Sequence, residues 1–261
     1  DNAFDPPKSA ANGVAPRVAQ IVRRDALGAW RDGNGRDWSS FVTWNLHDHD
    51  LAAINTSTLA VSYANRLMTT VMGLAVASDG RVATVGTEAL NEVRFEPMVK
   101  GIFIRARVAS FDPALGDAPL IADLNPHLDY IARTVAPEVR AQSLGDPRGV
   151  LFEPASGNLV VAGMGSDNVI VASPAGARIA RIEVGAGPTG LALAANGERL
   201  YVLNKFDASI TSIDMASHIE TARTSFFDPT STAVREGRPL LYDTHDGSGL
   251  GQAACASCHL D

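Results

Sequence analysis

The sequence predicts an all-β fold, a β-propeller built from four-stranded antiparallel blades. Short β-rich runs separated by Gly, Asn, Asp and Pro dominate the chain, and helical periodicity is scarce. These runs also repeat at a fixed offset. The offset that carries Pro147–Phe152 onto Pro188–Leu193 also carries Leu159–Val161 onto Leu200–Val202. Four strands in about 40 residues is the repeat length of a propeller blade.

The two clearest repeats predict consecutive blades at about 147–187 and 188–226. In each repeat a first strand leads into a turn, at Ser156–Asn158 and again at Asn196–Glu198, and a second and a third strand follow. Adjacent blades of this kind are expected to pack face to face.

A fourth strand is expected at Arg178–Val184 to complete the earlier of these blades. We expect the strands that contain Gly149 and Gly190 to lie innermost, because small residues suit positions where backbones converge.

Two more diverged copies precede these blades. The first runs through Phe41–Asn45 and Leu51–Asn55, which align without gaps on Leu200–Asp214. The second has strands at Gly73–Val76 and, further on, at Val108–Asp112. About four blades are therefore recognisable, which leaves open a larger, seven-bladed propeller.

The second diverged copy is longer than the others. Gly73 and Gly149 occupy matching positions, but their separation is nearly twice that between Gly149 and Gly190, so this blade carries insertions. We place them near residues 92–100 and 125–145. The propeller is predicted to span residues 1–228.

The pattern changes from Phe227–Pro229 onward, and the chain soon reaches the pentapeptide Cys255-Ala256-Ser257-Cys258-His259. The chain has two cysteines, and both lie in this motif. Thiols at this spacing can add to the two vinyl groups of one haem, and the following histidine can bind the iron. Cys255 and Cys258 are therefore the candidate anchors of a covalent haem c, and His259 is the candidate axial ligand of the haem iron.

Other interpretations of the motif remain open. A Cys-x-x-Cys pair can be a redox dithiol, which usually begins a helix after a strand, whereas here a glycine-rich stretch, Asp246–Gln252, precedes it. A zinc site would need a second ligand pair, and the sequence shows none at a matching short spacing. An incidental disulfide is the third alternative.

Residues 229–261 are predicted to be the amino-terminal part of a cytochrome c domain. Few large apolar side chains follow residue 229, so this segment is not expected to enclose a haem by itself. We expect it to be extended and docked on the propeller or on a neighbouring molecule.

Several segments resemble those of bacterial YVTN-type β-propeller proteins joined to a cytochrome c domain. The propeller segments are Asp146–Gly149, Gly163–Asn168, Gly187–Gly190 and Leu200–Phe206, and Gly237–His259 resembles the start of cytochrome domains, including those of di-haem peroxidase-like proteins. The resemblance implies a periplasmic or otherwise extracytoplasmic redox protein. It does not imply a substrate, because propellers host many unrelated functions.

The leading functional hypothesis is an extracytoplasmic electron-transfer protein, with the propeller as a docking or substrate platform and haem c in the intact protein. Its partner would be a redox protein or a small-molecule substrate. A haem-dependent oxidoreductase of a peroxidase-like kind is one alternative, so the chain is not assigned as an enzyme. A non-catalytic propeller binding module is the other.

Composition narrows the class of partner. The 261 residues carry a formal net charge of −7, so there is no electrostatic basis for nucleic-acid binding. No uncharged apolar run approaches the ~20 residues of a membrane-spanning helix. The amino end, Asp1–Pro7, has neither the basic start nor the apolar stretch of a signal peptide.

Two further groups have ordinary structural interpretations. His47 and His49 alternate with aspartates like metal ligands on a strand, but the repeat alignment places them in a loop, and we expect a solvated turn there. Trp30, Trp38 and Trp44 fall within one repeat and are expected to serve in packing.

Overall fold

The structure is a computed structural model of the whole chain. By its internal contacts the chain divides into two compact units, of which the larger comprises residues 49–88, 105–128 and 134–261 and the smaller comprises the rest. The structure describes residues 22–32, 35–44, 49–89, 104–113, 118–130, 132 and 134–257.

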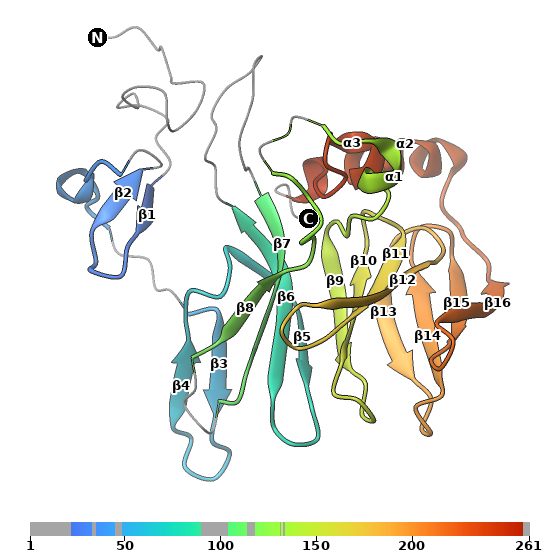
Figure 1. Ribbon diagram of the computed structural model, residues 1–261, viewed down its shortest axis with the longest axis horizontal. Coiled ribbons are helices and arrows are strands. Elements are labelled where there is room, and N and C mark those ends of the chain that lie inside the picture. Colours follow the sequence, from blue (N-terminus) through green and yellow to red (C-terminus); the bar gives the residue numbers. More distant parts are fainter. Residues whose placement is uncertain are drawn as a thin grey trace, which may run out of the picture. The chain divides into compact units, whose positions relative to one another are not determined.

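The larger unit is built from antiparallel sheets, and its blades follow one another along the chain (Figure 1). Half-blade A contains β3 (Leu51–Ile54) and β4 (Val61–Ala64). Blade B contains β5 (Thr70–Val76), β6 (Val82–Ala89), β7 (Ile104–Phe111) and β8 (Leu120–Asp123). Blade C contains β9 (Pro147–Phe152), β10 (Leu159–Gly163), β11 (Asn168–Ala172) and β12 (Arg178–Glu183). Blade D contains β13 (Pro188–Leu193), β14 (Arg199–Asn204), β15 (Ser209–Asp214) and β16 (Ile219–Ser225).

Blades C and D confirm the two repeats predicted at about 147–187 and 188–226. Each is a four-stranded antiparallel sheet in which consecutive strands pair. The predicted fourth strand of blade C is β12. The structure is thus a β-propeller of about four blades, one of them only half formed among the described residues.

The first strands of blades B, C and D are neighbours, with β9 lying between β5 and β13. A Cβ atom at Gly149 of β9 would stand 2.5 Å from the carbonyl oxygen of Thr189 in β13. Such a separation excludes any side chain. The prediction that this strand lies where backbones converge is confirmed.

Apolar side chains fill the space between successive blades. One face of blade C packs on blade B through a cluster that includes Leu159, Val161 and Ile170. The opposite face packs on blade D through a cluster that includes Val160 and Val169. Blade C is therefore buried on both faces, and the predicted face-to-face packing is confirmed.

Half-blade A corresponds to the third and fourth strands of a repeat, since the gap-free alignment of the first diverged copy carries β3 onto β15. The predicted strand at Phe41–Asn45 is wrong over its described part. Ser39–Phe41 is a 3-10 turn, and Val42–Trp44 belong to no strand. The Phe41 amide donates to the carbonyl oxygen of Trp38 at 2.8 Å and closes this turn, and the hydroxyl of Ser39 accepts a hydrogen bond from the Trp30 amide at 2.9 Å.

The three tryptophans lie in the smaller unit, which also holds the hairpin of β1 (Val22–Arg24) and β2 (Trp30–Asp32). Trp30 and Trp44 meet edge to face with ring centroids 5.2 Å apart. Trp38 is buried and lies against Phe41. Trp38 is thus a packing residue, as predicted, whereas Trp44 is 53% exposed, and these ring contacts lie within the smaller unit.

The predicted insertion at 125–145 follows the last strand of blade B. The chain leaves β8 at Asp123, forms the short helix α1 (Pro137–Arg140) and rejoins the sheets at Pro147. The other predicted insertion, at 92–100, lies outside the described residues.

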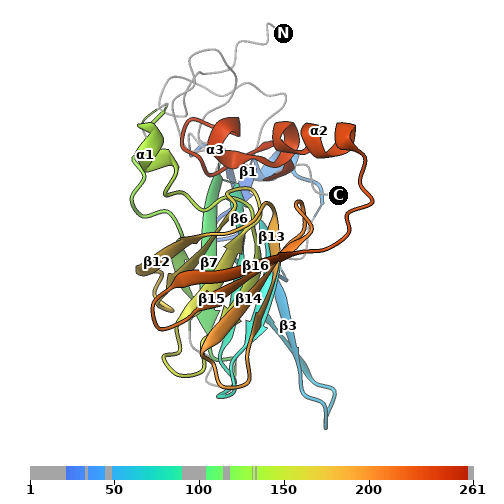
Figure 2. The ribbon, with the colours of Figure 1, turned by 90° about the vertical axis from the view of Figure 1, so that its right-hand side faces the viewer.

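Beyond β16 the chain forms helices, and we call residues 226–257 the tail. It contains α2 (Thr232–Tyr242), α3 (Thr244–Gly247) and the 3-10 turn η2 (Cys255–Ser257). Figure 2 shows α2 and α3 across the ends of the strands. The prediction of a docked tail is confirmed, whereas the prediction of an extended one is wrong over the helices. None of the helices in the described part of the chain is long and apolar enough to span a membrane.

The change from strands to helices falls between Ser225 and Thr232, and the predicted domain boundary at residue 228 stays a prediction. The assignment of residues 229–261 to a cytochrome c domain stays a prediction.

Candidate functional site

The tail is anchored to blade C by one threonine, at a place we call the Thr244 slot. The backbone amide and the hydroxyl of Thr244 both donate to the carbonyl oxygen of Gly165, at 2.7 and 2.8 Å. A Cβ at Gly165 would lie 2.6 Å from the methyl group of Thr244, and a Cβ at Gly145 would also overlap this side chain. Two glycines thus make room for a fully buried residue of the tail.

The insertion at 125–145 forms the second seat of the tail. Its Ser143 hydroxyl donates to the carbonyl oxygen of Leu250 at 2.7 Å, and the Val135 amide donates to that of Gly249 at 3.0 Å. The Nε2 atom of His245 lies 3.0 Å from the carbonyl oxygen of Ser143. Polar contacts therefore fix the path of the chain toward the cysteine motif.

Of the predicted haem-binding residues, the structure describes Cys255. Its side chain is exposed and its thiol is free, while the next two residues, Ala256 and Ser257, are buried. The Ser257 amide donates to the carbonyl oxygen of Ala254, and the Ala254 amide donates to the Ser257 hydroxyl at 3.0 Å. This small turn directs Cys255 outward. Cys258 and His259 lie outside the described residues.

Helix α2 packs against this cysteine turn and carries exposed apolar side chains. Leu240 is 86% exposed, and Val234 and Leu241 are also exposed. A covalently attached haem needs an accessible thiol and apolar surface nearby. The described residues supply both, so they fit the cofactor that the motif predicts.

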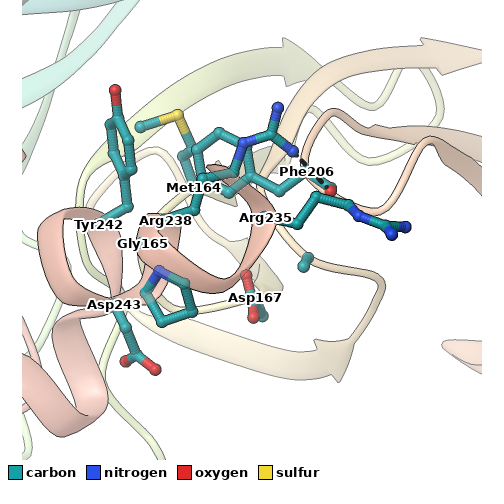
Figure 3. A pocket seen from close by; sticks show the side chains of 10 residues that line it. Met164, Gly165, Asp167, Phe206, Arg235, Arg238, Tyr242 and Asp243 are labelled. Carbon is teal, nitrogen blue, oxygen red and sulfur yellow. Dashed lines mark hydrogen bonds between the residues drawn. The ribbon is translucent and has the colours of Figure 1, made fainter. Parts of the chain in front are cut away.

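A cavity of about 100 Å³ lies between α2 and the loops at the ends of blades C and D (Figure 3). The Arg238 guanidinium stacks 5.3 Å from the ring centroid of Phe206 and donates to its carbonyl oxygen at 2.9 Å. Tyr242 approaches the same ring with centroids 4.9 Å apart. These contacts hold α2 against blade D. The lining residues are Met164, Gly165, Asp167, Ala186, Phe206, Arg235, Arg238, Pro239, Tyr242 and Asp243.

Asp167 borders this cavity in the turn between β10 and β11, where its backbone adopts a positive φ of 50°. One carboxylate oxygen accepts a hydrogen bond from the Gly187 amide at 2.8 Å. Loss of water around this partly exposed carboxylate raises the pKa of Asp167 and outweighs the hydrogen bond from Gly187, which lowers it; the nearby charge of Asp243 raises the pKa further. The carboxylate group is thus less readily ionised than one in water.

The His-Asp pairs before β3 behave as loop residues where they are described. His49 stacks on the Tyr63 ring at 3.9 Å, and Asp50 accepts a hydrogen bond from the Leu67 amide at 2.8 Å. His47 lies outside the described residues. In the part of the chain that the structure describes, no three His, Cys, Asp or Glu side chains gather as a metal site.

The Thr244 slot was not predicted, although the sequence contains a signal for it. At the offset that relates the two clear repeats, Gly145 and Gly165 of blade C match Ala186 and Phe206 of blade D. Blade C therefore has glycine where its sister repeat has side chains, and the docked tail accounts for the difference.

Comparison with known proteins finds no matching family model, and no matching curated protein. Solved structures do resemble the chain. Hydrazine synthase of Kuenenia stuttgartiensis is 15% identical over 76% of this chain and 53% of its own, with a TM-score of 0.48. A nidogen/laminin complex is 13% identical over 76% and 59%, with a TM-score of 0.47. Apo AztD of Citrobacter koseri is 14% identical over 70% and 45%, with a TM-score of 0.38. The chain thus spans about half the length of these structures, and the propeller assignment rests on its own sheets.

Proposed function

We propose that this chain belongs to an extracytoplasmic electron-transfer protein that carries haem c, with the propeller as its docking platform. One observation carries the proposal: the thiol of Cys255 stands exposed on a hydrogen-bonded turn that packs against α2, a helix with exposed apolar side chains. In the intact protein Cys255 and Cys258 would hold the haem covalently, and His259 would be an axial ligand of its iron. The bound haem would supply reversible one-electron chemistry.

The residues of this chain would give that centre a fixed position. Thr244 binds the tail to blade C eleven residues before Cys255, and Leu250 binds it to the insertion five residues before Cys255. A redox centre held in this way would stand beside the loops at the ends of blades C and D, where a partner protein could dock. Fixed positioning supports electron transfer because every docked partner then meets the haem at the same distance and orientation.

Haem attachment in the polypeptide that the gene encodes tests the proposal. That polypeptide would be exported in cells that make the cytochrome maturation machinery, and covalent haem would be detected by staining a denaturing gel. We expect staining in the parent protein and none after Cys255→Ala and Cys258→Ala together. His259→Ala should keep some covalent haem but change the absorption spectrum of the iron.

The matched control is His49→Ala, which changes a histidine outside the motif and should leave staining unchanged. No covalent haem in the parent protein would contradict the proposal and favour a dithiol or a binding module. Haem with rapid peroxide turnover would instead assign the oxidoreductase alternative.

A further inference from the structure

The cavity beneath α2 carries a negative and a positive side chain that do not pair with each other. Asp167 lines it from the turn between β10 and β11, and Arg235 lines it from α2 (Figure 3). Both residues are exposed to water. The ion pairs among the described residues include none between these two. Two opposite charges at one cavity are therefore available to a ligand.

The carboxylate of Asp167 has one of its two oxygens occupied by the protein. Its Oδ1 atom accepts a hydrogen bond from the Gly187 amide at 2.8 Å, and among the described residues no donor contacts Oδ2. Loss of water, and then the nearby negative charge of Asp243, raise the pKa of Asp167. An ammonium group at Oδ2 would supply the missing opposite charge and a charge-assisted hydrogen bond.

The turn that holds Asp167 does not require an aspartate. The matching residue of blade D is Ala208, with a φ of 49° against 50° for Asp167. The same left-handed backbone thus forms without a carboxylate. An ionisable side chain that costs stability in the free protein, where alanine suffices for the turn, is typical of a binding site.

Arg235 is the arginine of α2 that the protein does not fix. Its guanidinium lies 3.5 Å from the Thr232 hydroxyl, at the outer limit of a hydrogen bond. Arg238, by contrast, donates to the Phe206 carbonyl oxygen at 2.9 Å and to the Thr230 hydroxyl at 3.0 Å. The Arg235 guanidinium can therefore bind a carboxylate through two parallel hydrogen bonds.

The size and the walls of the cavity limit the ligand to a small molecule with an apolar part. Its volume of about 100 Å³ equals the space of about three water molecules. A nucleotide or a sugar is too large for this space, whereas a short aliphatic group fits. The apolar surface comes from Met164, Ala186, Phe206, Pro239 and Tyr242.

We propose that this cavity binds a small apolar α-amino acid as its zwitterion, with the ammonium group on Asp167 and the carboxylate on Arg235. The aliphatic side chain of the ligand would lie against the apolar walls. A zwitterion satisfies both charges at once, whereas an anion would leave Asp167 without a partner and a cation would leave Arg235 without one.

Isothermal titration calorimetry of the 261-residue chain at neutral pH tests the proposal. The probes are the free amino acid alanine, propionate, which lacks the ammonium group, and ethylammonium, which lacks the carboxylate. We expect alanine to bind with a dissociation constant between about 10 µM and 1 mM. Propionate and ethylammonium should each bind at least about tenfold more weakly.

Two variants identify the contacts. Asp167→Asn and Arg235→Gln should each weaken the binding of alanine at least about tenfold. Both residues are exposed, so both variants should fold, which circular dichroism checks. Arg199→Gln is the matched control, because Arg199 is exposed at the end of β14 opposite to Phe206 and should leave binding unchanged.

Four results would overturn the proposal. Propionate bound as tightly as alanine, with a loss in Arg235→Gln alone, would make this an anion site. Ethylammonium bound as tightly, with a loss in Asp167→Asn alone, would make it a cation site. The others are alanine binding that both variants keep, and no binding of alanine up to about 20 mM. Haem content has no part in these measurements, so their outcome is independent of the proposed function.

Discussion

Blades C and D have the same repeat, the same strand order and nearly the same turns, yet their strands are buried differently. Every residue of β10 and β11 in blade C is buried, whereas β14 in blade D alternates between exposed and buried positions. Among the described residues, blade C lies between two neighbours and blade D contacts one. The number of neighbouring blades, and not the repeat itself, therefore determines how fully the strands of a blade are buried.

The difference extends to the ends of the blades. Blade C has Gly165 where blade D has Phe206, and the two residues receive the tail in different ways. Gly165 accepts the buried Thr244, while Phe206 supports Arg238 and Tyr242 from the side. Blade C thus holds the tail by polar contacts in a closed slot, and blade D holds it by stacking at a cavity.

The largest expected difference between blades C and D is the cost of a charge at a buried and at an exposed strand position. Val161→Asp places a carboxylate at a fully buried position between blades B and C, and should reduce the unfolding free energy by about 4 kcal/mol. Leu203→Asp in β14 of blade D changes a side chain that is 40% exposed, and it should cost less than about 1 kcal/mol. Urea unfolding of the 261-residue chain, followed by circular dichroism, measures both. Similar losses would show that the two faces are equally buried.

The second largest difference is expected between the innermost strands, in the stability lost when a glycine is replaced by alanine. Gly149→Ala forces a methyl group against the carbonyl oxygen of Thr189, so we expect a loss of about 2 kcal/mol. Gly190→Ala meets only the side chain of Leu203 and should cost less than about 1 kcal/mol in the same chain. The same urea titration compares them. A larger loss at Gly190 would contradict the order of crowding described above.

The Thr244 slot provides the third prediction. Gly165→Ala would place a methyl group against Thr244 and should weaken docking of the tail by about 1.5 kcal/mol. Limited proteolysis should then cleave residues 226–257 about tenfold faster, since about 1.4 kcal/mol corresponds to a factor of ten. Gly237→Ala on α2 meets open space and serves as the control. Equal cleavage of the two variants would show that the slot does not hold the tail.

The smallest effect depends on pH. Asp167 in blade C and Ala208 in blade D occupy matching turn positions, with positive φ values of 50° and 49°. Burial raises the pKa of Asp167 in the folded chain, so the folded state loses stability as the pH rises through that pKa. Asp167→Asn should remove this loss and stabilise the chain near pH 7 by about 0.5 kcal/mol or less, since the group is partly exposed.

Thermal unfolding from pH 3 to pH 8 measures this effect. The advantage of Asp167→Asn should disappear as the pH falls below the ordinary range of an aspartate. Ala208→Gly introduces no ionisable group, so its effect should be independent of pH. An advantage of Asp167→Asn that grows in acid would show that the pKa is lowered and not raised.

The sequence was most informative where a local pattern repeats without interruption. Turns and apolar runs at a fixed offset identify blades C and D, because each strand is defined by its own residues and turns. The same alignment failed at Phe41–Asn45. There the apolar pattern resembles a strand, but Ser39–Phe41 forms a 3-10 turn instead and Phe41 is exposed.

The tail was predicted less well for a different physical reason. Its low apolar content predicted an extended segment, yet helices form there and Thr244, Ser143 and Leu250 fix them through hydrogen bonds. Contacts between residues so far apart in the chain leave no periodic signal in the sequence. The haem-binding role of Cys255, Cys258 and His259 stays a prediction from their spacing.

The Thr244 slot also determines how mechanical load would enter the propeller. Tension applied beyond η2 first reaches Leu250 and Gly249, which are bonded to the insertion, and then Thr244, which is bonded to blade C. Blade D is connected to the chain on the far side of these bonds, through β16. A pull on whatever follows the tail is therefore borne first by the doubly packed blade C, and the strands of blade D are shielded from being peeled one by one.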